Sequence, residues 1–315
     1  MPYSKLKKRL DDGEVVILDG ATGTELQRRG IDMDPAAWCG VATLGNDRLL
    51  SDIHRDYIAV GAEVITANTF ASSRLMLSGA GYGDQVAEIN RRAVEAALHA
   101  RDTAPDGRAV VVAGSLSHMI PIAEGTAKSD LRKLPSDSQL SDAFHEVAQI
   151  LKASGAELII LEMMYHPQRA KLALEAAQAT GLPLWFGLSA RRDRKGRMIS
   201  FLQHEDLPLS AVTDLLPAAG VDAAGCMHSG ADLIAEAQAE TRKTFDGALM
   251  AYPDGGYFEM PDWRFIDVIE PQRMEAFFLD WLHQGTRIIG ACCGLSVEHI
   301  QAAARARDRF VQSRA

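Results

Sequence analysis

One pattern repeats eight times along the chain, and this repetition limits the fold more than any other feature. Short apolar runs rich in β-branched residues occur at residues 15–18, 63–66, 109–113, 158–161, 184–188, 221–224, 247–251 and 287–290. Each run is continuously apolar rather than alternating, as is typical of strands buried on both faces of a parallel sheet. The sequence therefore predicts eight parallel strands.

Segments with helical periodicity separate these runs. One apolar stripe recurs at positions 140, 143, 144, 147, 150 and 151 and ends before Gly155, and another recurs at 274, 277, 278, 281 and 282 and is closed by Gly285. Eight strand–helix units without a sharp break in composition predict an α/β fold, a (β/α)8 TIM barrel forming a single domain over 1–315. A doubly wound open sheet is the alternative. We favour the barrel because the count of units is eight and the last unit runs nearly to the chain end.

Composition excludes several classes of protein. The net charge is −9 and no basic cluster stands out, so we expect no nucleic acid partner. No apolar run approaches the roughly 20 residues that a membrane span needs, and no signal peptide follows the basic start. With four cysteines and no export signal, we expect a cytoplasmic protein whose cysteines serve metal binding or catalysis rather than disulfides.

Three of the four cysteines lie where predicted strands end. Cys226 follows the sixth strand, and the adjacent Cys292 and Cys293 follow the eighth. Vicinal cysteines rarely form a disulfide with each other, whereas three thiolates suit zinc and leave its fourth position open. Any one of them alone could be a packing residue, but the trio favours a metal site. We expect Cys39 to be structural, and His228 to be solvent-facing or hydrogen-bonded rather than a fourth ligand.

Other polar residues also follow the predicted strands, at the end of a barrel where active sites lie. They are Asp19, Asn68, Thr69, Ser115, Glu162 and Asp254. Asp19 and Glu162 directly abut apolar strands, which suits binding of a substrate ammonium group. Asp19 shaping a turn and Glu162 as a plain loop carboxylate are the alternatives. Long connections at 19–47 and 114–137 are also expected to be functional.

Five segments resemble those of the homocysteine S-methyltransferase family, and the resemblance spans almost the whole chain. They are Leu18-Asp-Gly-Ala-Thr-Gly-Thr-Glu-Leu26, Ala67-Asn-Thr-Phe70, Leu158-Ile-Ile-Leu-Glu162, Tyr252-Pro-Asp-Gly-Gly256 and Ile288-Ile-Gly-Ala-Cys-Cys-Gly-Leu-Ser-Val-Glu-His-Ile300. The last, with its double cysteine, is the most specific. The first two look most like the homocysteine-binding module of cobalamin-dependent methionine synthase and are also compatible with stand-alone members that use S-methylmethionine.

The resemblance implies a barrel in which Cys226, Cys292 and Cys293 hold Zn²⁺ and the homocysteine sulfur takes the fourth position. It also implies that Asp19 and Glu162 contact the amino group of homocysteine. The full substrate-binding set that we predict is Asp19, Gly20, Thr22, Asn68, Ser115 and Glu162. Zinc would keep the substrate sulfur as a thiolate, since a free thiol has a pKa of about 8.5.

The chain departs from the family pattern in places. Gly225 stands where the family usually has Asn before the first zinc cysteine, and Asp254 replaces an Asn after the seventh strand. The third-strand exit and residues 295–297 also differ. We expect these changes to affect the donor side rather than the zinc and amino-acid contacts.

The length leaves no room for the folate, cobalamin and reactivation modules of cobalamin-dependent methionine synthase. We therefore expect the methyl group to come from a small molecule or a partner protein. Small candidates are S-methylmethionine, S-adenosylmethionine, a betaine or a dimethylsulfonio acid, with homocysteine or a close thiol such as selenohomocysteine as acceptor and methionine as product. The alternatives are the homocysteine-binding subunit of a system with a methylated corrinoid protein, and a non-catalytic amino-acid-binding or zinc-binding barrel.

Overall fold

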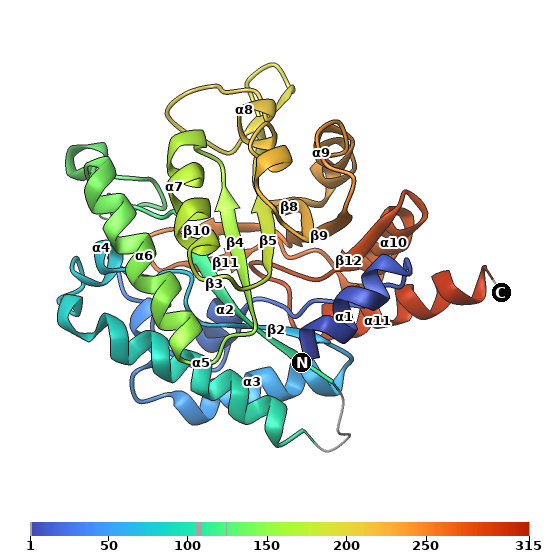
Figure 1. The fold of residues 1–315 in the computed structure, drawn as a ribbon, viewed down its shortest axis with the longest axis horizontal. Coiled ribbons are helices and arrows are strands. Elements are labelled where there is room, and N and C mark those ends of the chain that lie inside the picture. Colours follow the sequence, from blue (N-terminus) through green and yellow to red (C-terminus); the bar gives the residue numbers. More distant parts are fainter. Residues whose placement is uncertain (1, 105–108, 124, 315) are drawn as a thin grey trace.

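Eight parallel strands surround a central axis in the computed structural model, which describes residues 2–104, 109–123 and 125–314 (Figure 1). The strands are β1 (Val16–Ile17), β2 (Val64–Ala67), β3 (Val111–Ser117), β4 (Leu158–Met164), β5 (Leu184–Leu188), β8 (Ala223–Gly230), β9 (Ala248–Asp254) and β12 (Thr286–Ile289). Their order in the sheet is β1-β12-β9-β8-β5-β4-β3-β2. A parallel bridge between Leu18 and Val64 joins the two outermost strands. The predicted (β/α)8 barrel is therefore confirmed.

Four strands continue at least three residues further at their carboxyl ends than the sequence predicted. β3 ends at Ser117, β4 at Met164, β8 at Gly230 and β9 at Asp254. The predicted runs stopped where continuous apolar character stopped, but the backbone pairing extends into the polar residues that follow. These extensions matter because they carry the residues of the site described below.

The helices surround the strands as expected for this fold. They are α1 (Pro2–Asp11), α2 (Thr22–Arg28), α3 (Asp47–Ala59), α4 (Arg74–Leu77), α5 (Val86–Asp102), α6 (Asp137–Ala153), α7 (Pro167–Gln178), α8 (Ser210–Thr213), α9 (Ile234–Thr241), α10 (Pro271–His283) and α11 (Val297–Gln312). The two helices predicted from apolar stripes are α6 and α10. A reciprocal capping box of Ser136 and Gln139 fixes the start of α6. Within the described part of the chain, none of these helices is long and apolar enough to span a bilayer.

Successive strand residues contribute to two different cores. Side chains such as Ile17, Phe186 and Ala224 pack outward against the helices. Their neighbours along the strands, among them Trp185 and Met227, fill the inside of the barrel. Because side chains alternate across a strand, a shift of one position moves a residue from one core to the other.

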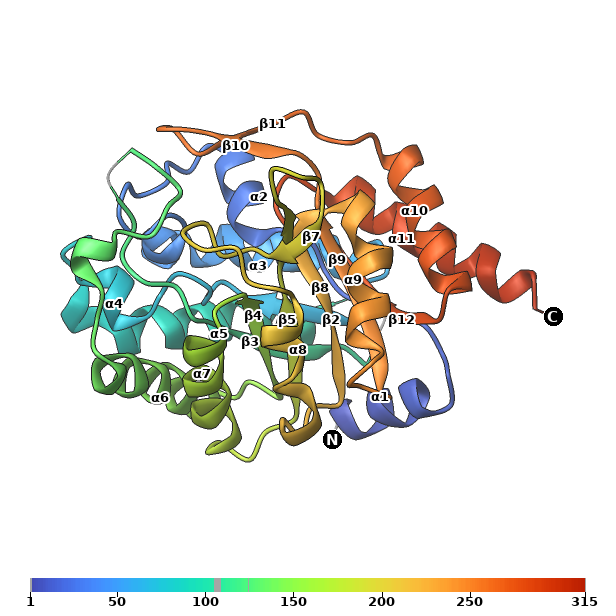
Figure 2. The ribbon, with the colours of Figure 1, turned by 90° about the horizontal axis from the view of Figure 1, so that it is seen from above.

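The two ends of the barrel are closed differently. Tyr3, Leu6 and Leu10 of α1 belong to the inner core, so α1 covers the amino-terminal end of the strands. At the other end lie two antiparallel hairpins, β6–β7 (Ala190–Arg192 and Met198–Ser200) and β10–β11 (Tyr257–Glu259 and Arg264–Ile266). In Figure 2 the β10–β11 hairpin lies at the top of the view and α1 at the bottom.

Candidate functional site

A cavity of about 480 Å³ lies at the carboxyl ends of the strands. It is lined by residues from the exits of β1, β2, β4, β8, β9 and β12 and from both hairpins. A cavity of this size suits a small-molecule site, and its position is where barrels of this fold carry their active sites.

Two thiols, an imidazole and a carboxylate converge on one wall of this cavity. The Sγ atoms of Cys292 and Cys293 are 3.8 Å apart. The Nδ1 atom of His228 lies 3.9 Å from the first sulfur and 3.7 Å from the second. An oxygen of Asp254 is 3.1 Å from the same nitrogen, and one ligand atom from each of the four residues lies within 4.8 Å of the others. Such a donor set is suited to zinc.

The third predicted thiol lies outside this group, so the structure does not bring the three cysteines together. Cys226 belongs to the core between the barrel and the helices, on the same side of β8 as Ala224. Its Sγ lies 3.3 Å from the hydroxyl of Ser229, and its side chain is not part of the cavity wall. Burial raises the pKa of the Cys226 thiol to about 12. The sequence could not reveal this orientation because both faces of the strand are apolar.

His228 reaches the cavity through an irregularity in β8. Strict alternation would put it on the helix-facing side with Cys226. Its backbone instead has a φ of 44°, and the pairing of β8 with β9 shifts register between Met227 and Gly230. Its side chain consequently lines the cavity beside the two thiols. His228 is hydrogen-bonded, which is one of the two predicted possibilities, and the only sequence signal for a position beside the thiols is its place two residues after Cys226.

Backbone hydrogen bonds between the exits of β9 and β12 fix the two vicinal cysteines. The N–H of Cys292 donates to the carbonyl of Pro253 at 2.9 Å, and the N–H of Cys293 donates to Oδ1 of Asp254 at 3.1 Å. The carbonyl of Cys293 accepts from Gly255 at 2.9 Å. These bonds fix the backbone from which both thiols project into the cavity.

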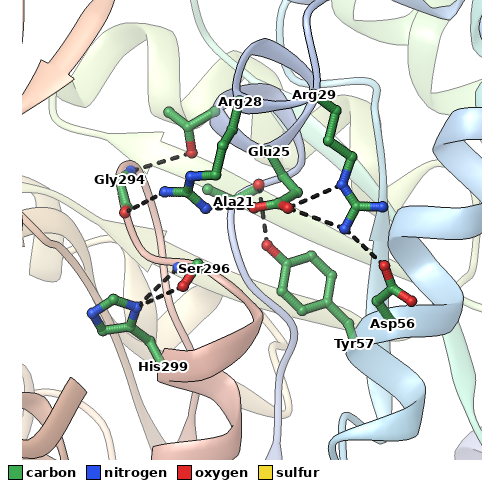
Figure 3. Close-up of polar contacts among 10 residues, drawn as sticks. Ala21, Glu25, Arg28, Arg29, Asp56, Tyr57, Gly294, Ser296 and His299 are labelled. Atoms are coloured by element: carbon green, nitrogen blue, oxygen red, sulfur yellow. Dashed lines mark hydrogen bonds and ion pairs between the residues drawn. The ribbon is translucent and has the colours of Figure 1, made fainter.

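The next residue, Gly294, can only be glycine. Its φ is +80°, and a Cβ there would lie 2.0 Å from a ring carbon of Phe265. Its N–H donates to Oγ1 of Thr24 at 3.2 Å, and its carbonyl accepts from Arg28 at 3.3 Å (Figure 3). Arg28 in turn pairs with Glu25 of the same helix at 2.6 Å. Helix α2 thus holds the turn that follows the cysteines.

Asp19 occupies the β1 exit and is almost fully buried. Its two carboxylate oxygens accept hydrogen bonds from the N–H of Thr66 at 2.7 Å and from the hydroxyl of Thr66 at 3.0 Å. Burial raises the pKa of Asp19 well above its usual range, the bonds from Thr66 oppose this shift, and the negative charge of Glu162 adds to it. A cation bound in the cavity would favour the ionised form of Asp19.

Glu162 lines the cavity from β4 and has a comparable environment. Burial raises its pKa to about 7, while a hydrogen bond from the hydroxyl of Ser115 opposes the shift. The side chain is 9% exposed. The two buried carboxylates line one cavity, and the charge of Glu162 helps to raise the pKa of Asp19, so they form an acidic region that a substrate ammonium group would neutralise.

The other predicted substrate-binding residues divide into two groups. Gly20, Thr22 and Asn68 line the cavity. Ser115 lies behind the wall and acts through Glu162, and Thr69 bonds the backbone of Ser115 with distances of 2.8 and 2.9 Å. The side-chain amide of Asn68 donates to a carbonyl of the 19–47 connection at 2.9 Å, so it also shapes the wall.

Close packing explains the glycine that follows Asp19. A Cβ on Gly20 would lie 2.8 Å from the ring of Tyr57. The hydroxyl of Tyr57 donates to the carbonyl of Ala21 at 3.2 Å and so fixes this turn (Figure 3). Gly20 therefore contributes to the site by allowing the chain to approach α3 closely.

An aromatic wall, which sequence reasoning missed, faces the same cavity. It consists of Trp38, Phe70, Phe258, Trp263 and Phe265. Trp38 contacts Trp263 at a centroid distance of 5.9 Å, and Phe258 contacts Trp263 at 5.4 Å. Trp38 and Trp263 share a buried cluster with Cys293. Phe258, Trp263 and Phe265 come from the β10–β11 hairpin, whereas Trp38 and Phe70 come from two other connections, so no single local motif signals their meeting.

A sequence model of one family matches nearly the whole chain. The model described as homocysteine S-methyltransferase aligns with residues 16–307. The chain belongs to this family. It is therefore an S-methyltransferase of the homocysteine type, as the motifs predicted, and the family's activity is methyl transfer to homocysteine.

Similar proteins cover most of the chain at low identity. Homocysteine S-methyltransferase 2 from Zea mays is 24% identical, with 94% of this chain and 91% of that protein aligned. Betaine–homocysteine S-methyltransferase 1 from Danio rerio is 26% identical, over 94% of this chain and 74% of that protein. The metallated form of the homocysteine methyltransferase MmuM from Escherichia coli superposes with a TM-score of 0.75 at 21% identity, covering 97% of this chain and all (100%) of that one. At that identity the structural likeness supports the fold.

Proposed function

We propose that this S-methyltransferase moves a methyl group from a small cationic donor to the thiol of homocysteine and so forms methionine. One observation carries the proposal: the buried carboxylates of Asp19 and Glu162 line the same cavity as the thiols of Cys292 and Cys293. An amino acid with a sulfur at its other end matches both features.

The acidic region would bind the amino group of homocysteine. Asp19 and Glu162 each have a raised pKa because they are buried, and an ammonium group beside them would stabilise their ionised forms. The bonds from Thr66 and Ser115 keep the two carboxylates in place. These contacts would aim the substrate sulfur at the cysteines and hold it in one orientation.

The cysteine wall would hold a zinc ion. A bound zinc ion would keep the substrate sulfur as a nucleophilic thiolate at neutral pH, although a free thiol has a pKa of about 8.5. Cys292 and Cys293 supply two of the ligands, and their positions are fixed by backbone bonds to Pro253 and Asp254. The surrounding apolar side chains would keep water away from the sulfur.

The aromatic wall supports a positively charged donor. Faces of Trp and Phe attract sulfonium and quaternary ammonium groups, and Trp38 and Trp263 share a buried cluster with Cys293. The sulfur lone pair would attack the methyl carbon in line, forming an S–C bond while the donor's S–C or N–C bond breaks. The donor would leave as a neutral sulfide or amine. A cavity of about 480 Å³ suits such a small donor better than a corrinoid.

The test is a donor panel with purified protein, reductant, added zinc and homocysteine. S-methylmethionine, S-adenosylmethionine, glycine betaine and a dimethylsulfonio acid, each with a deuterated methyl group, would be compared by mass spectrometry of the methionine formed. We expect labelled methionine from at least one of them. Transfer only from a methylated corrinoid protein would contradict the small-donor proposal. Selenohomocysteine as acceptor would measure selectivity for sulfur.

A further inference from the structure

The geometry points to a metal site in which His228, not Cys226, is the third protein ligand beside Cys292 and Cys293. In this site Asp254 is the fourth ligand of the metal until the sulfur of the substrate replaces it. This inference rests on the proposed function for the identity of the substrate. The ligand set itself rests on the positions of four side chains.

The separations between the donor atoms match the edges of a tetrahedron around zinc. With a Zn–S bond of about 2.3 Å and a Zn–N bond of about 2.0 Å, two sulfurs lie about 3.8 Å apart, and a sulfur and a nitrogen lie about 3.5 Å apart. The two thiols of Cys292 and Cys293 are separated by 3.8 Å. Nδ1 of His228 lies 3.9 and 3.7 Å from them. Three corners are thus already in place.

The thiol of Cys226 cannot reach the third ligand position without refolding β8. Its side chain lies on the helix-facing side of the strand, and its backbone is in register with Leu188 of β5 and Ala251 of β9. Turning it inward would require a one-residue slip that exchanges the faces of the whole strand. The slip would also put Met227 and Ala223 of the inner core against the helices. The structure needs no such slip, because the local irregularity brings His228 to the cavity while Cys226 stays on the helix-facing side.

The carboxylate of Asp254 is suited to be the metal ligand that the substrate replaces. One oxygen accepts the N–H of Cys293 at 3.1 Å, and the other lies 3.1 Å from Nδ1 of His228, which a tetrahedral edge allows. Zinc holds soft sulfur well, so a carboxylate is the donor that an incoming thiolate displaces most readily. The exchange replaces one negative ligand with another and leaves the charge of the site unchanged. Asp254 would keep its bond to Cys293 after leaving.

The experiment counts the neighbours of bound zinc by X-ray absorption in the full-length, zinc-loaded protein. Without substrate we expect about two sulfur and two nitrogen or oxygen neighbours, and with homocysteine about three sulfurs and one nitrogen. Zinc content by elemental analysis gives the second readout. Neither measurement requires methyl transfer, so a negative donor panel would leave this result interpretable.

Three variants decide the identity of the third ligand. Cys226→Ala is the matched control and should keep both the zinc content and the sulfur count. His228→Ala should weaken zinc binding by more than the roughly tenfold to hundredfold cost of losing an outer-shell partner. His228→Cys should retain zinc and raise the sulfur count by one, which a merely misfolded variant would not do.

Three outcomes would overturn the inference. A substrate-free sulfur count that falls by one in Cys226→Ala would restore the three-cysteine site. An unchanged count in His228→Cys would remove His228 from the site. A sulfur count that stays the same when homocysteine is added would show that Asp254 is not the exchanging ligand.

Discussion

The hydrogen bonding of buried tyrosine and tryptophan side chains differs between the two ends of the barrel. At the amino-terminal end, the hydroxyl of Tyr3 donates to Asp222 at 2.6 Å and accepts from the indole of Trp185 at 3.1 Å. At the carboxyl end, the indole nitrogens of Trp38 and Trp263 find no hydrogen-bond partner among the described residues. One end is satisfied by the chain itself, and the other presents unpaired groups around a cavity.

The contrast indicates that buried polar groups stabilise the fold at the amino-terminal end and are available for binding at the carboxyl end. An unpaired buried polar group costs about 1–3 kcal/mol, and a ligand bound in the cavity could offset that cost for the two indole nitrogens beside it. The acidic residues follow the same division: Asp19 and Glu162 are buried at the carboxyl end with raised pKa values. Substitutions at the two ends should therefore affect different measurements.

The largest effect should come from the cysteine wall. Cys292→Ala or Cys293→Ala should reduce methyl transfer by more than about a hundredfold, because each removes a metal ligand and not only an outer-shell partner. Zinc content and initial rates would be measured together in reductant with added zinc. The free energy of unfolding of the zinc-free protein should change by no more than about 1 kcal/mol. Full activity of the variants without bound metal would contradict the proposed role of this wall.

The acidic region should give the next largest effect. Asp19→Asn and Glu162→Gln each remove one charge-assisted contact worth about 1.5–3 kcal/mol, or about a tenfold to hundredfold loss. We expect this loss mainly as a higher KM for homocysteine, with zinc content unchanged. A change in the donor KM alone would instead place these residues on the donor side.

The aromatic wall should give a smaller, donor-specific effect. Trp263→Leu should raise the donor KM by about fivefold to thirtyfold, the equivalent of about 1–2 kcal/mol of cation–π attraction in a buried site. The KM for homocysteine should not change. Trp263→Phe keeps an aromatic face and should retain most of the affinity. Equal effects of both substitutions would show that Trp263 acts by packing alone.

The pH dependence of kcat/KM for homocysteine should report Glu162. Its pKa of about 7 in the free protein means that the carboxylate becomes ionised as pH rises through 7, so binding of the ammonium group improves in that direction. Below pH 7, kcat/KM for homocysteine should fall by up to about tenfold for each pH unit. The ratio of wild type to Glu162→Gln isolates this group from the titration of the substrate thiol. A ratio independent of pH from 6 to 8 would show that Glu162 stays ionised throughout.

The smallest kinetic effect should come from the amino-terminal end. Tyr3→Phe removes the hydroxyl that joins Asp222 to Trp185 and should lower the free energy of unfolding by about 1–3 kcal/mol. Both KM values and kcat should remain those of the wild type. Urea denaturation measures the free energy of unfolding, and steady-state kinetics measure kcat and the two KM values. A kinetic defect would mean that the two ends are coupled.

The repeated pattern predicted the barrel and left a doubly wound open sheet as the alternative. Eight continuous apolar runs require strands buried on both faces, and helical stripes between them require a parallel arrangement. The same logic placed Asp19, Glu162 and the two vicinal cysteines at one end, because parallel strands all finish on the same side. Residues that follow a strand directly could therefore be grouped from the sequence.

Side-chain orientation and long-range meeting points could not be predicted in this way. Trp38 and Trp263 come from connections far apart in the chain, and their contact depends on how the β10–β11 hairpin folds over the cavity. Ser115 follows the predicted third strand, yet β3 continues through it, and its hydroxyl acts through Glu162. Position at a strand exit identified the right region but not the role of each residue.

The sequence by itself determined the barrel, the family and the end of the sheet at which the site lies, because these depend on composition and periodicity along the chain. The tertiary structure decided that His228 rather than Cys226 faces the two thiols. Apolar side chains occupy both faces of β8, so periodicity could not tell its inner residues from its outer ones. A φ of 44° at His228 and the register shift against β9 set that orientation, and both arise only when the strands pair.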